Sequence, residues 1–197
     1  AKLHIVSHQE NHLEAGVWSA GGPEAERFLL LHASGGTTDI LLCDPGDGER
    51  PFEVKRIGGT LDINAGQAID RAGVYMGLRF PAGAELERLA RENCEKIDKA
   101  KICVNGLSCN LSGLENKATQ MFDSGASKEK TAAFVIDFIT RTLEKLTLNL
   151  RDEYKDIPIV YAGGVMSCGI IKDKLSRYGS FALPAFSADN AAGIALL

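Results

Sequence analysis

The chain has 197 residues, of which 45% are hydrophobic and 24% charged, and its formal net charge is -4. This size and composition are typical of a globular protein with one ordinary domain or two small lobes. The mild acidity argues against a strongly basic nucleic-acid-binding domain, and no apolar run approaches the ~20 residues of a membrane span.

The cysteines predict reduced thiols in a cytoplasmic protein. They number five, an odd count, and form no C-x-x-C pair. The first residues lack the basic-then-apolar pattern of a signal peptide. No cysteine has a histidine at a local spacing that marks a nucleophile, so we interpret Cys43, Cys94, Cys103, Cys109 and Cys168 as core thiols.

The N-terminal stretch predicts a helix from about residue 8 to residue 19, capped by Ser7 and ended by a Gly-Gly-Pro sequence. His8 and His12 are four residues apart and share one face of this helix, so both can reach one metal ion. The alternative is an ordinary amphipathic helix with one buried and one solvated histidine.

A metal would need a third ligand, for which Glu10, Glu14 and Asp189 are candidates. Glu10 serves better as the capping partner of Ser7, because it points away from the histidines. Two histidines and one carboxylate leave coordination positions open, which suits iron or zinc. Asp189 can equally be a plain N-cap.

A three-stranded meander follows, with strands at 27–33, 38–43 and 52–57. Its first hairpin contains Ser34-Gly35-Gly36-Thr37, and such small residues let the backbone and hydroxyls approach a phosphate closely. The alternative is a turn that merely needs glycine. A second glycine pair, Gly163-Gly164, lies between a buried strand and a helix, where adenosine or ribose can lie flat, or where the chain simply makes a tight turn.

The remaining pattern predicts helices joined by short strands, with a break at 58–60 and a loop at 105–113. The helix that contains Asp70 leaves that carboxylate either functional or a solvated partner of Arg71 or Lys55. We expect linkers at 21–26 and 109–127. The predicted helices are 63–78, 84–93, 128–151, 167–177 and 189–197, and the predicted strands are 102–104, 159–162 and 181–183.

This order of elements indicates an α/β fold with a mixed sheet flanked by helices. It is the order of a ribonuclease-H-like lobe, the building block of actin-like ATPases. We therefore assign residues 27–197 to a C-terminal actin-like lobe. Residues 1–26 are expected to be a metal-site helix and a linker that belong with a preceding lobe.

Six stretches resemble motifs of the tRNA threonylcarbamoyladenosine transferases, a family also labelled O-sialoglycoprotein endopeptidase or glycoprotease. Their order and rough spacing agree over nearly the whole chain. Residues 7–13 resemble H-x-E-x-H-L, 33–38 V-S-G-G-H-T, 58–71 G-E-T-x-D-D-A-x-G-E-A-F-D-K, 80–83 Y-P-G-G, 162–165 A-G-G-V and 188–191 T-D-N-A.

The resemblance implies an actin-like fold and transfer of a threonylcarbamoyl group to the exocyclic amine of adenosine 37 in tRNA. It implies one divalent metal, Fe or Zn, held by His8, His12 and Asp189. It leaves the catalytic residues unidentified. The residues implied to line the site for ATP or threonylcarbamoyl-adenylate are Ala33, Ser34, Gly35, Gly36, Thr37, Asp70, Gly83, Gly163, Gly164 and Cys168.

Three positions differ from the family motifs: Thr37 replaces a histidine, Cys168 an asparagine and Gly59 a glutamate. The family also carries a preceding lobe, so we expect this chain either to be a fragment or to pair with something that supplies that lobe. The resemblance further implies tRNA and the proteins of the modification complex as partners. It implies an acyltransferase when the protein is complete and not a protease, because no H-E-x-x-H arrangement is present.

Two alternatives keep the same fold. One is a non-catalytic paralogue that binds nucleotide or docks a partner. The other is a carbamoyltransferase or kinase that acts on a small molecule.

Overall fold

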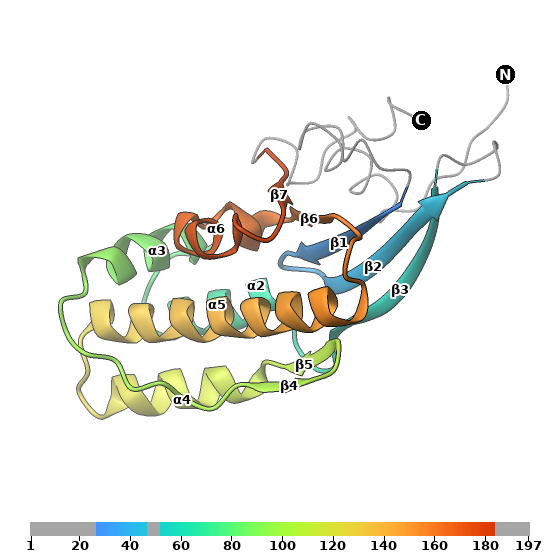
Figure 1. The fold of residues 1–197 in the computed structure, drawn as a ribbon. Helices are drawn as coiled ribbons and strands as arrows, with labels where there is room; N and C mark the ends of the chain where they lie inside the picture. The colour runs from blue at the N-terminus through green and yellow to red at the C-terminus, as the bar shows by residue number, and fades with distance from the viewer. Residues whose placement is uncertain (1–26, 47–51, 184–197) are drawn as a thin grey trace, which may run out of the picture.

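Seven strands form one mixed sheet in the computed structural model, which describes residues 27–46 and 52–183. Their order is β4-β5-β3-β2-β1-β6-β7, and β6 and β7 run parallel to β1 (Figure 1). The predicted helices at 8–19 and 189–197, the linker at 21–26 and the division at residue 27 lie outside the described residues or at their edge. The strands are β1 (Phe28–Ala33), β2 (Thr38–Pro45), β3 (Phe52–Thr60), β4 (Cys103–Asn105), β5 (Ser108–Asn110), β6 (Ile159–Ala162) and β7 (Ser180–Phe181).

The predicted meander is confirmed. β1 pairs with β2 and β2 with β3, both antiparallel. Every side chain of β1 is buried, as its run of leucines predicts for a strand covered on both faces. The strand predicted at 159–162 is also confirmed and lies beside β1.

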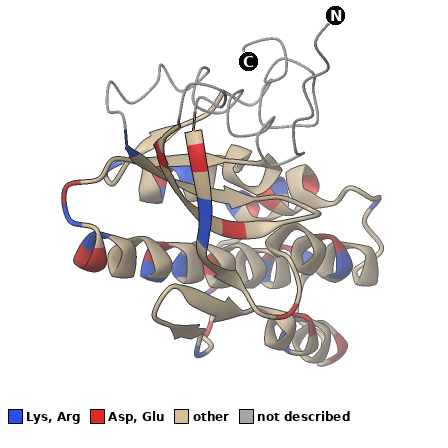
Figure 2. Ribbon diagram, turned by 90° about the vertical axis from the view of Figure 1, so that its right-hand side faces the viewer, with Lys and Arg blue, Asp and Glu red and all other residues tan. Residues whose placement is uncertain are grey.

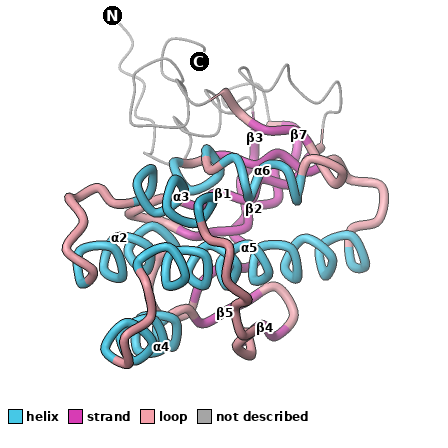
Figure 3. The backbone as a smooth tube through the Cα atoms, turned by 90° about the vertical axis from the view of Figure 1, so that its left-hand side faces the viewer, coloured by secondary structure: helices cyan, strands magenta, loops and turns pink. Residues whose placement is uncertain are grey.

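The helices pack mainly against one face of the sheet, and Figure 3 shows them in front of the strands. The long helix α5 runs through the middle of this layer and contacts α2, α3, α4 and α6. Its buried stripe includes Phe134, Phe138, Leu143 and Leu146, as its apolar spacing predicts. The helices are α2 (Ala65–Tyr75), α3 (Gly83–Glu92), α4 (Ser112–Asp123), α5 (Lys128–Glu153), the short 3₁₀ turn η1 (Gly164–Ser167) and α6 (Gly169–Leu175).

Both signs of charge are spread along the helices (Figure 2). On α3, for example, Arg88 lies between Glu85 and Glu92 and pairs with both. None of the five cysteines, all of which lie in the described residues, forms a disulfide. No described helix combines the length and apolar character that a membrane span needs.

Two predictions about loops are wrong. The expected linker at 109–127 contains helix α4, and the expected loop at 105–113 contains part of the β4–β5 hairpin. α4 has a weak apolar pattern, because only Leu114 and Ala118 of its side chains are buried. Its N-terminal N–H groups are capped from a distant part of the chain, which local sequence does not reveal.

The expected chain break at 58–60 is also wrong, because β3 continues to Thr60. The two glycines are there for close approach of neighbouring backbone and not for a turn. A Cβ on Gly58 would lie 2.3 Å from the carbonyl oxygen of Leu107, and one on Gly59 would lie 2.3 Å from that of Thr38. Gly59 also has a φ of +133°.

Asp62 provides the distant cap of α4. Its Oδ1 accepts from the N–H of Leu111 at 2.8 Å, and its Oδ2 accepts from the N–H and hydroxyl of Ser112 at 3.0 and 2.6 Å. Partial burial alone would raise the pKa of Asp62, but the hydrogen bonds from Leu111, Ser112 and Ile63 lower it well below its usual value.

This cap predicts a pH-dependent stability. Because the folded-state pKa of Asp62 lies below the unfolded value of about 4, its stabilisation is complete above about pH 5 and is lost as the pH falls below about 4. Asp62→Asn should lower the free energy of unfolding by about 1–2 kcal/mol at neutral pH and reduce its acid dependence. Denaturant titrations from pH 3 to 7 measure both effects.

The matched control is Asp98→Asn, because Asp98 is exposed and makes no hydrogen bond or ion pair within the described residues. It should leave the profile unchanged. Identical acid profiles for Asp62→Asn and the wild type would contradict the capping role.

Candidate functional site

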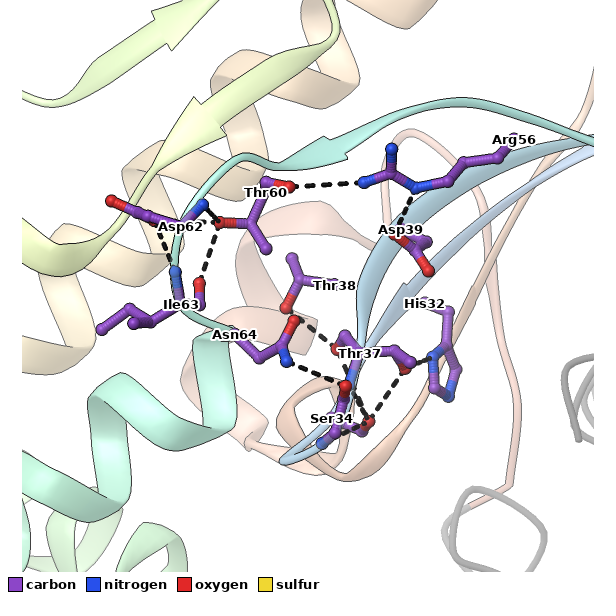
Figure 4. Close-up of polar contacts among 11 residues, drawn as sticks. His32, Ser34, Thr37, Thr38, Asp39, Arg56, Thr60, Asp62, Ile63 and Asn64 are labelled. Atoms are coloured by element: carbon purple, nitrogen blue, oxygen red, sulfur yellow. Dashed lines mark hydrogen bonds and ion pairs between the residues drawn. The ribbon is translucent and has the colours of Figure 1, made fainter.

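The hairpin between β1 and β2 is seated on the N-terminus of α2 (Figure 4). The N–H of Gly66 donates to the carbonyl oxygen of Ser34 at 3.0 Å, and the N–H of Ala65 donates to Thr38 Oγ1 at 2.8 Å. The side-chain amide of Asn64 donates to the carbonyl oxygen of Gly36 at 2.8 Å. The loop therefore caps the helix, and the helix in turn fixes the loop.

Gly66 makes this seating possible. A Cβ at this position would lie 2.6 Å from the backbone nitrogen of Gly35, which no real contact allows. The first turn of α2 carries no acidic residue, so its partial positive charge is directed at the hairpin without a competing carboxylate. An anion held at the hairpin would be stabilised by that charge.

The side chain of Ser34 binds two backbone N–H groups inside the hairpin. Its Oγ accepts from the N–H groups of Gly36 and Thr37 at 3.3 and 3.1 Å. The Gly35 N–H has no acceptor within the described residues, and a Cβ on Gly35 would meet nothing within 4 Å. The N–H of Gly35 is therefore the backbone donor of this loop that is available to a ligand.

The second glycine loop touches the first. Gly163 has a φ of +102°, and a Cβ there would lie 2.2 Å from the carbonyl oxygen of Ala33. Ala33, Gly163 and the hairpin thus form one continuous backbone surface. Gly164, in contrast, faces open space, since a Cβ there would meet nothing within 4 Å.

A pocket of about 340 Å³ opens beside these loops. Of the residues predicted from the sequence, Gly35, Asp70, Gly83, Gly164 and Cys168 all line it, although they come from four separate parts of the chain. Its lining residues are Gly35, Gly66, Ile69, Asp70, Pro81, Gly83, Ala84, Glu87, Ile136, Gly164, Val165, Ser167 and Cys168.

Asp70 lies in one wall of this pocket and stabilises it by a hydrogen bond. Its Oδ1 accepts from the N–H of Ala82 at 2.8 Å, which fixes the start of α3 next to Gly83. It is not the solvated partner of Arg71 considered from the sequence, because Arg71 pairs with Glu115. Asp70 Oδ2 accepts no hydrogen bond within the described residues, so it is available to a ligand.

Glu87 is a pocket residue that the sequence analysis missed. Its Oε1 accepts from Gly169 N at 3.0 Å and from Arg91 Nε and Nη2 at 3.0 and 2.8 Å. The spacing of Gly83 and Glu87, one helical turn apart on α3, is the signal that could have identified it.

Cys168 lies beside Glu87 in the pocket wall. Burial is the main cause that raises the pKa of the Cys168 thiol, and the negative charge of Glu87 raises it further. A raised pKa favours the neutral thiol over the thiolate. Compared with an asparagine, it offers only weak hydrogen bonding.

The pocket thus has two chemically different ends. The hairpin end offers a backbone N–H and the positive terminus of α2, which suit phosphate. The α3 end offers carboxylate oxygens of Asp70 and Glu87, which accept from hydroxyl or amine groups. Ile69, Ile136 and Val165 add an apolar surface to the lining.

The predicted metal ligands His8, His12 and Asp189 lie outside the described residues. Within residues 27–46 and 52–183, no group of three His, Cys, Asp or Glu side chains could hold a metal ion.

Substitution of Gly66 tests the seating of the hairpin. Gly→Ala in a helix normally stabilises, but here the Cβ would push the hairpin away from α2, so we expect a loss of about 1–3 kcal/mol in the free energy of unfolding. Gly113 occupies the same second position of helix α4 and has open space around it. Gly113→Ala is therefore the matched control and should be neutral or stabilising by up to about 1 kcal/mol.

Chemical denaturation of both variants measures the difference. If Gly66→Ala were as stable as Gly113→Ala, the close contact between α2 and the hairpin would not be a constraint on the fold.

Comparison with known proteins identifies relatives of the whole chain. The family model described as TsaD, tRNA N6-adenosine threonylcarbamoyltransferase, matches residues 1–196. Relatives with that name are 31% identical in Thermus thermophilus, covering 98% of this chain and 59% of the relative, and 31% identical in Archaeoglobus fulgidus, covering 73% and 44%. The chain therefore spans about half of the length of these relatives.

Two solved structures share the fold. HypF in a phosphate- and nucleotide-bound form has a TM-score of 0.71 at 14% identity and is matched by 97% of this chain over 34% of its own. An activator of 2-hydroxyisocaproyl-CoA dehydratase from Clostridium difficile, with bound ADPNP, has a TM-score of 0.60 at 14% identity, with coverages of 97% and 65%. The expected actin-like ATPase fold is confirmed.

Proposed function

The chain belongs to the tRNA N6-adenosine threonylcarbamoyltransferase family, and from this premise we propose that it forms one wall of the site that binds ATP or threonylcarbamoyl-adenylate. In the complete protein, this site transfers the threonylcarbamoyl group to the N6 amine of adenosine 37 in tRNA. The convergence of two glycine loops, Asp70 and Glu87 on one pocket is the observation that carries the proposal.

The two ends of the pocket suggest how the ligand lies. Its phosphate is held near the Gly35 N–H and the N-terminus of α2. Its ribose hydroxyls donate to the carboxylates of Asp70 and Glu87, as carboxylates commonly bind ribose. The adenosine rests against Gly164 and Val165, since Gly164 presents no side chain there.

The same contacts favour the reaction. When the N6 amine attacks the carbamoyl carbon, a C–N bond forms, the carbon–oxygen bond to the phosphate breaks and the amine loses one proton to solvent. Negative charge grows on the leaving phosphate. The N–H of Gly35 and the terminus of α2 face that charge. We assign Asp70 and Glu87 to the ribose hydroxyls and assign no catalytic residue.

The proposal extends to parts that the described residues do not contain. We propose that His8, His12 and Asp189 hold one divalent metal, Fe or Zn, which would polarise a carbonyl or phosphate oxygen. A preceding lobe would close the other side of the pocket. The tRNA and other proteins of the modification complex would be its partners.

Filling the pocket tests the nucleotide site. A side chain on Gly164 has room in the folded protein, so Gly164→Leu should leave the melting temperature nearly unchanged but lower the affinity for an ATP analogue at least about tenfold. Gly113→Leu, on the exposed start of α4, is the control and should bind normally. Calorimetry with the protein from its complete gene measures both.

The same variants test the reaction in cells that lack threonylcarbamoyladenosine. The wild-type gene and Gly113→Leu should restore the modified nucleoside, measured by mass spectrometry of tRNA, and Gly164→Leu should not. Nucleotide binding without restoration of the modified nucleoside would favour a non-catalytic paralogue or an enzyme acting on a small molecule. The substitutions at Thr37 and Cys168 are the reason to consider these alternatives. Absence of both would contradict the proposed site.

The metal is tested by elemental analysis of the complete protein. The wild type should carry about one Fe or Zn per chain, and His12→Ala should lose most of it. His4→Ala is the control, because His4 is outside the H-x-E-x-H segment. Equal, near-zero metal in the wild type and in His12→Ala would rule out this metal site.

A further inference from the structure

The hairpin contains a chain of hydrogen bonds that begins at a buried histidine (Figure 4). His32 Nδ1 lies 2.6 Å from Thr37 Oγ1, and Thr37 Oγ1 lies 3.1 Å from Ser34 Oγ. Ser34 Oγ in turn accepts from two backbone N–H groups of the loop. His32 is on β1, only 7% exposed, so its ring approaches the loop from inside the protein.

The number of protons and lone pairs on each hydroxyl determines which group donates in each of these hydrogen bonds. A hydroxyl has one proton and two lone pairs. The N–H groups of Gly36 and Thr37 use both lone pairs of Ser34 Oγ, so Thr37 cannot donate to it. Ser34 must donate instead, and its nearer acceptor is Thr37 Oγ1 at 3.1 Å, against 3.5 Å for the Thr37 carbonyl oxygen.

The proton of Thr37 then has one remaining acceptor, His32 Nδ1. By this assignment Nδ1 carries no proton, and a neutral imidazole is protonated at Nε2. The chain therefore runs from Ser34 through Thr37 to His32. Loss of the Thr37 hydroxyl leaves Ser34 only the more distant Thr37 carbonyl oxygen as its acceptor. Loss of the His32 ring leaves the Thr37 hydroxyl without the acceptor that orients it.

We propose that His32 and Thr37 are positioning residues for the phosphate-binding hairpin. They hold Ser34 Oγ as the acceptor that draws the Gly36 and Thr37 N–H groups inward, so that the Gly35 N–H is the donor presented to a ligand phosphate. The inference rests on the proposed nucleotide site and adds the residues that shape it. Neither side chain lines the pocket, so they act through Ser34 and not by contact.

The substitution pattern of this chain supports the pairing. Thr37 stands where the resembling family motif has a histidine, and a threonine alone is too short to replace an imidazole. In this chain an imidazole is present at position 32 instead, and it reaches the same part of the loop from β1. The threonine and the histidine together span the space between the strand and the loop.

A purely structural role makes a different prediction from a positioning role. General loosening of the lobe would weaken every ligand of the pocket. A change confined to the hairpin would lower the affinity only for a ligand with phosphates, because we expect adenosine to be bound by Asp70, Glu87 and Gly164. Comparison of an ATP analogue with adenosine therefore separates the two roles.

The experiment uses the protein from its complete gene and calorimetric titration with a non-hydrolysable ATP analogue and with adenosine. Thr37→Val, which keeps the shape but removes the hydroxyl, should lower the affinity for the analogue about tenfold and that for adenosine less than about twofold. Thr37→Ser keeps the hydroxyl and should restore wild-type affinity. Thr142→Val is the control, because it removes the hydroxyl of a more deeply buried threonine, which lies in α5 and donates to the carbonyl oxygen of Phe138.

His32→Leu should have the same effect as Thr37→Val. The double variant should bind the analogue no more weakly than either single variant, because both substitutions interrupt the same series of hydrogen bonds. If His32→Leu does not fold, the comparison of Thr37→Val with Thr37→Ser decides alone. Wild-type binding of the analogue together with unchanged affinity in Thr37→Val would overturn this inference and leave the proposed function intact. Failure of the wild type to bind the analogue at all would overturn the proposed function and this inference with it.

Discussion

The contact between the first hairpin and the N-terminus of α2 is the constraint on which the rest of the site depends. Both partners have polar backbone groups that would otherwise be unsatisfied, and each satisfies the other. The contact is possible only because Gly66 has no side chain. It directs the positive end of a helix at a loop whose free Gly35 N–H also carries partial positive charge, so an anion at the hairpin would be stabilised.

A second level of support comes from behind the pocket. Asp70, on α2, holds the N–H of Ala82 and so places the first turn of α3, and Gly73 on the same helix lets Ala82 pack directly against it. The phosphate end and the carboxylate end of the pocket are therefore both fixed relative to α2. A change in the tilt of this one helix would therefore move both ends together.

The features predicted correctly from the sequence are those carried by local pattern. The leucine run of β1, the long apolar spacing of α5 and the two glycine pairs each have a direct physical meaning. The errors have non-local causes. α4 is capped by Asp62, which is distant in sequence, and Gly58 and Gly59 lie against the backbone of Leu107 and Thr38. The residues next to α4 and next to the two glycines therefore do not predict these structures. Glu87 was missed although its spacing from Gly83 was a local signal, because the contact with Gly169 that places it in the pocket wall joins residues far apart in sequence.

The three differences from the family motifs carry unequal weight in the folded lobe. Gly59 adopts a positive φ and approaches the backbone of Thr38, so a glutamate at this position would be strained, and the change follows from local geometry. Thr37 is matched by His32, which supplies an imidazole from the adjacent strand. Cys168 has no such replacement: its thiol is neutral, makes only weak hydrogen bonds and lies beside the carboxylate of Glu87. Of the three positions, only 168 is among the residues that line the pocket. An amide at that position could donate to a ligand acceptor, whereas here that part of the pocket is lined by a weak donor and a carboxylate, which favours ligand groups that themselves donate.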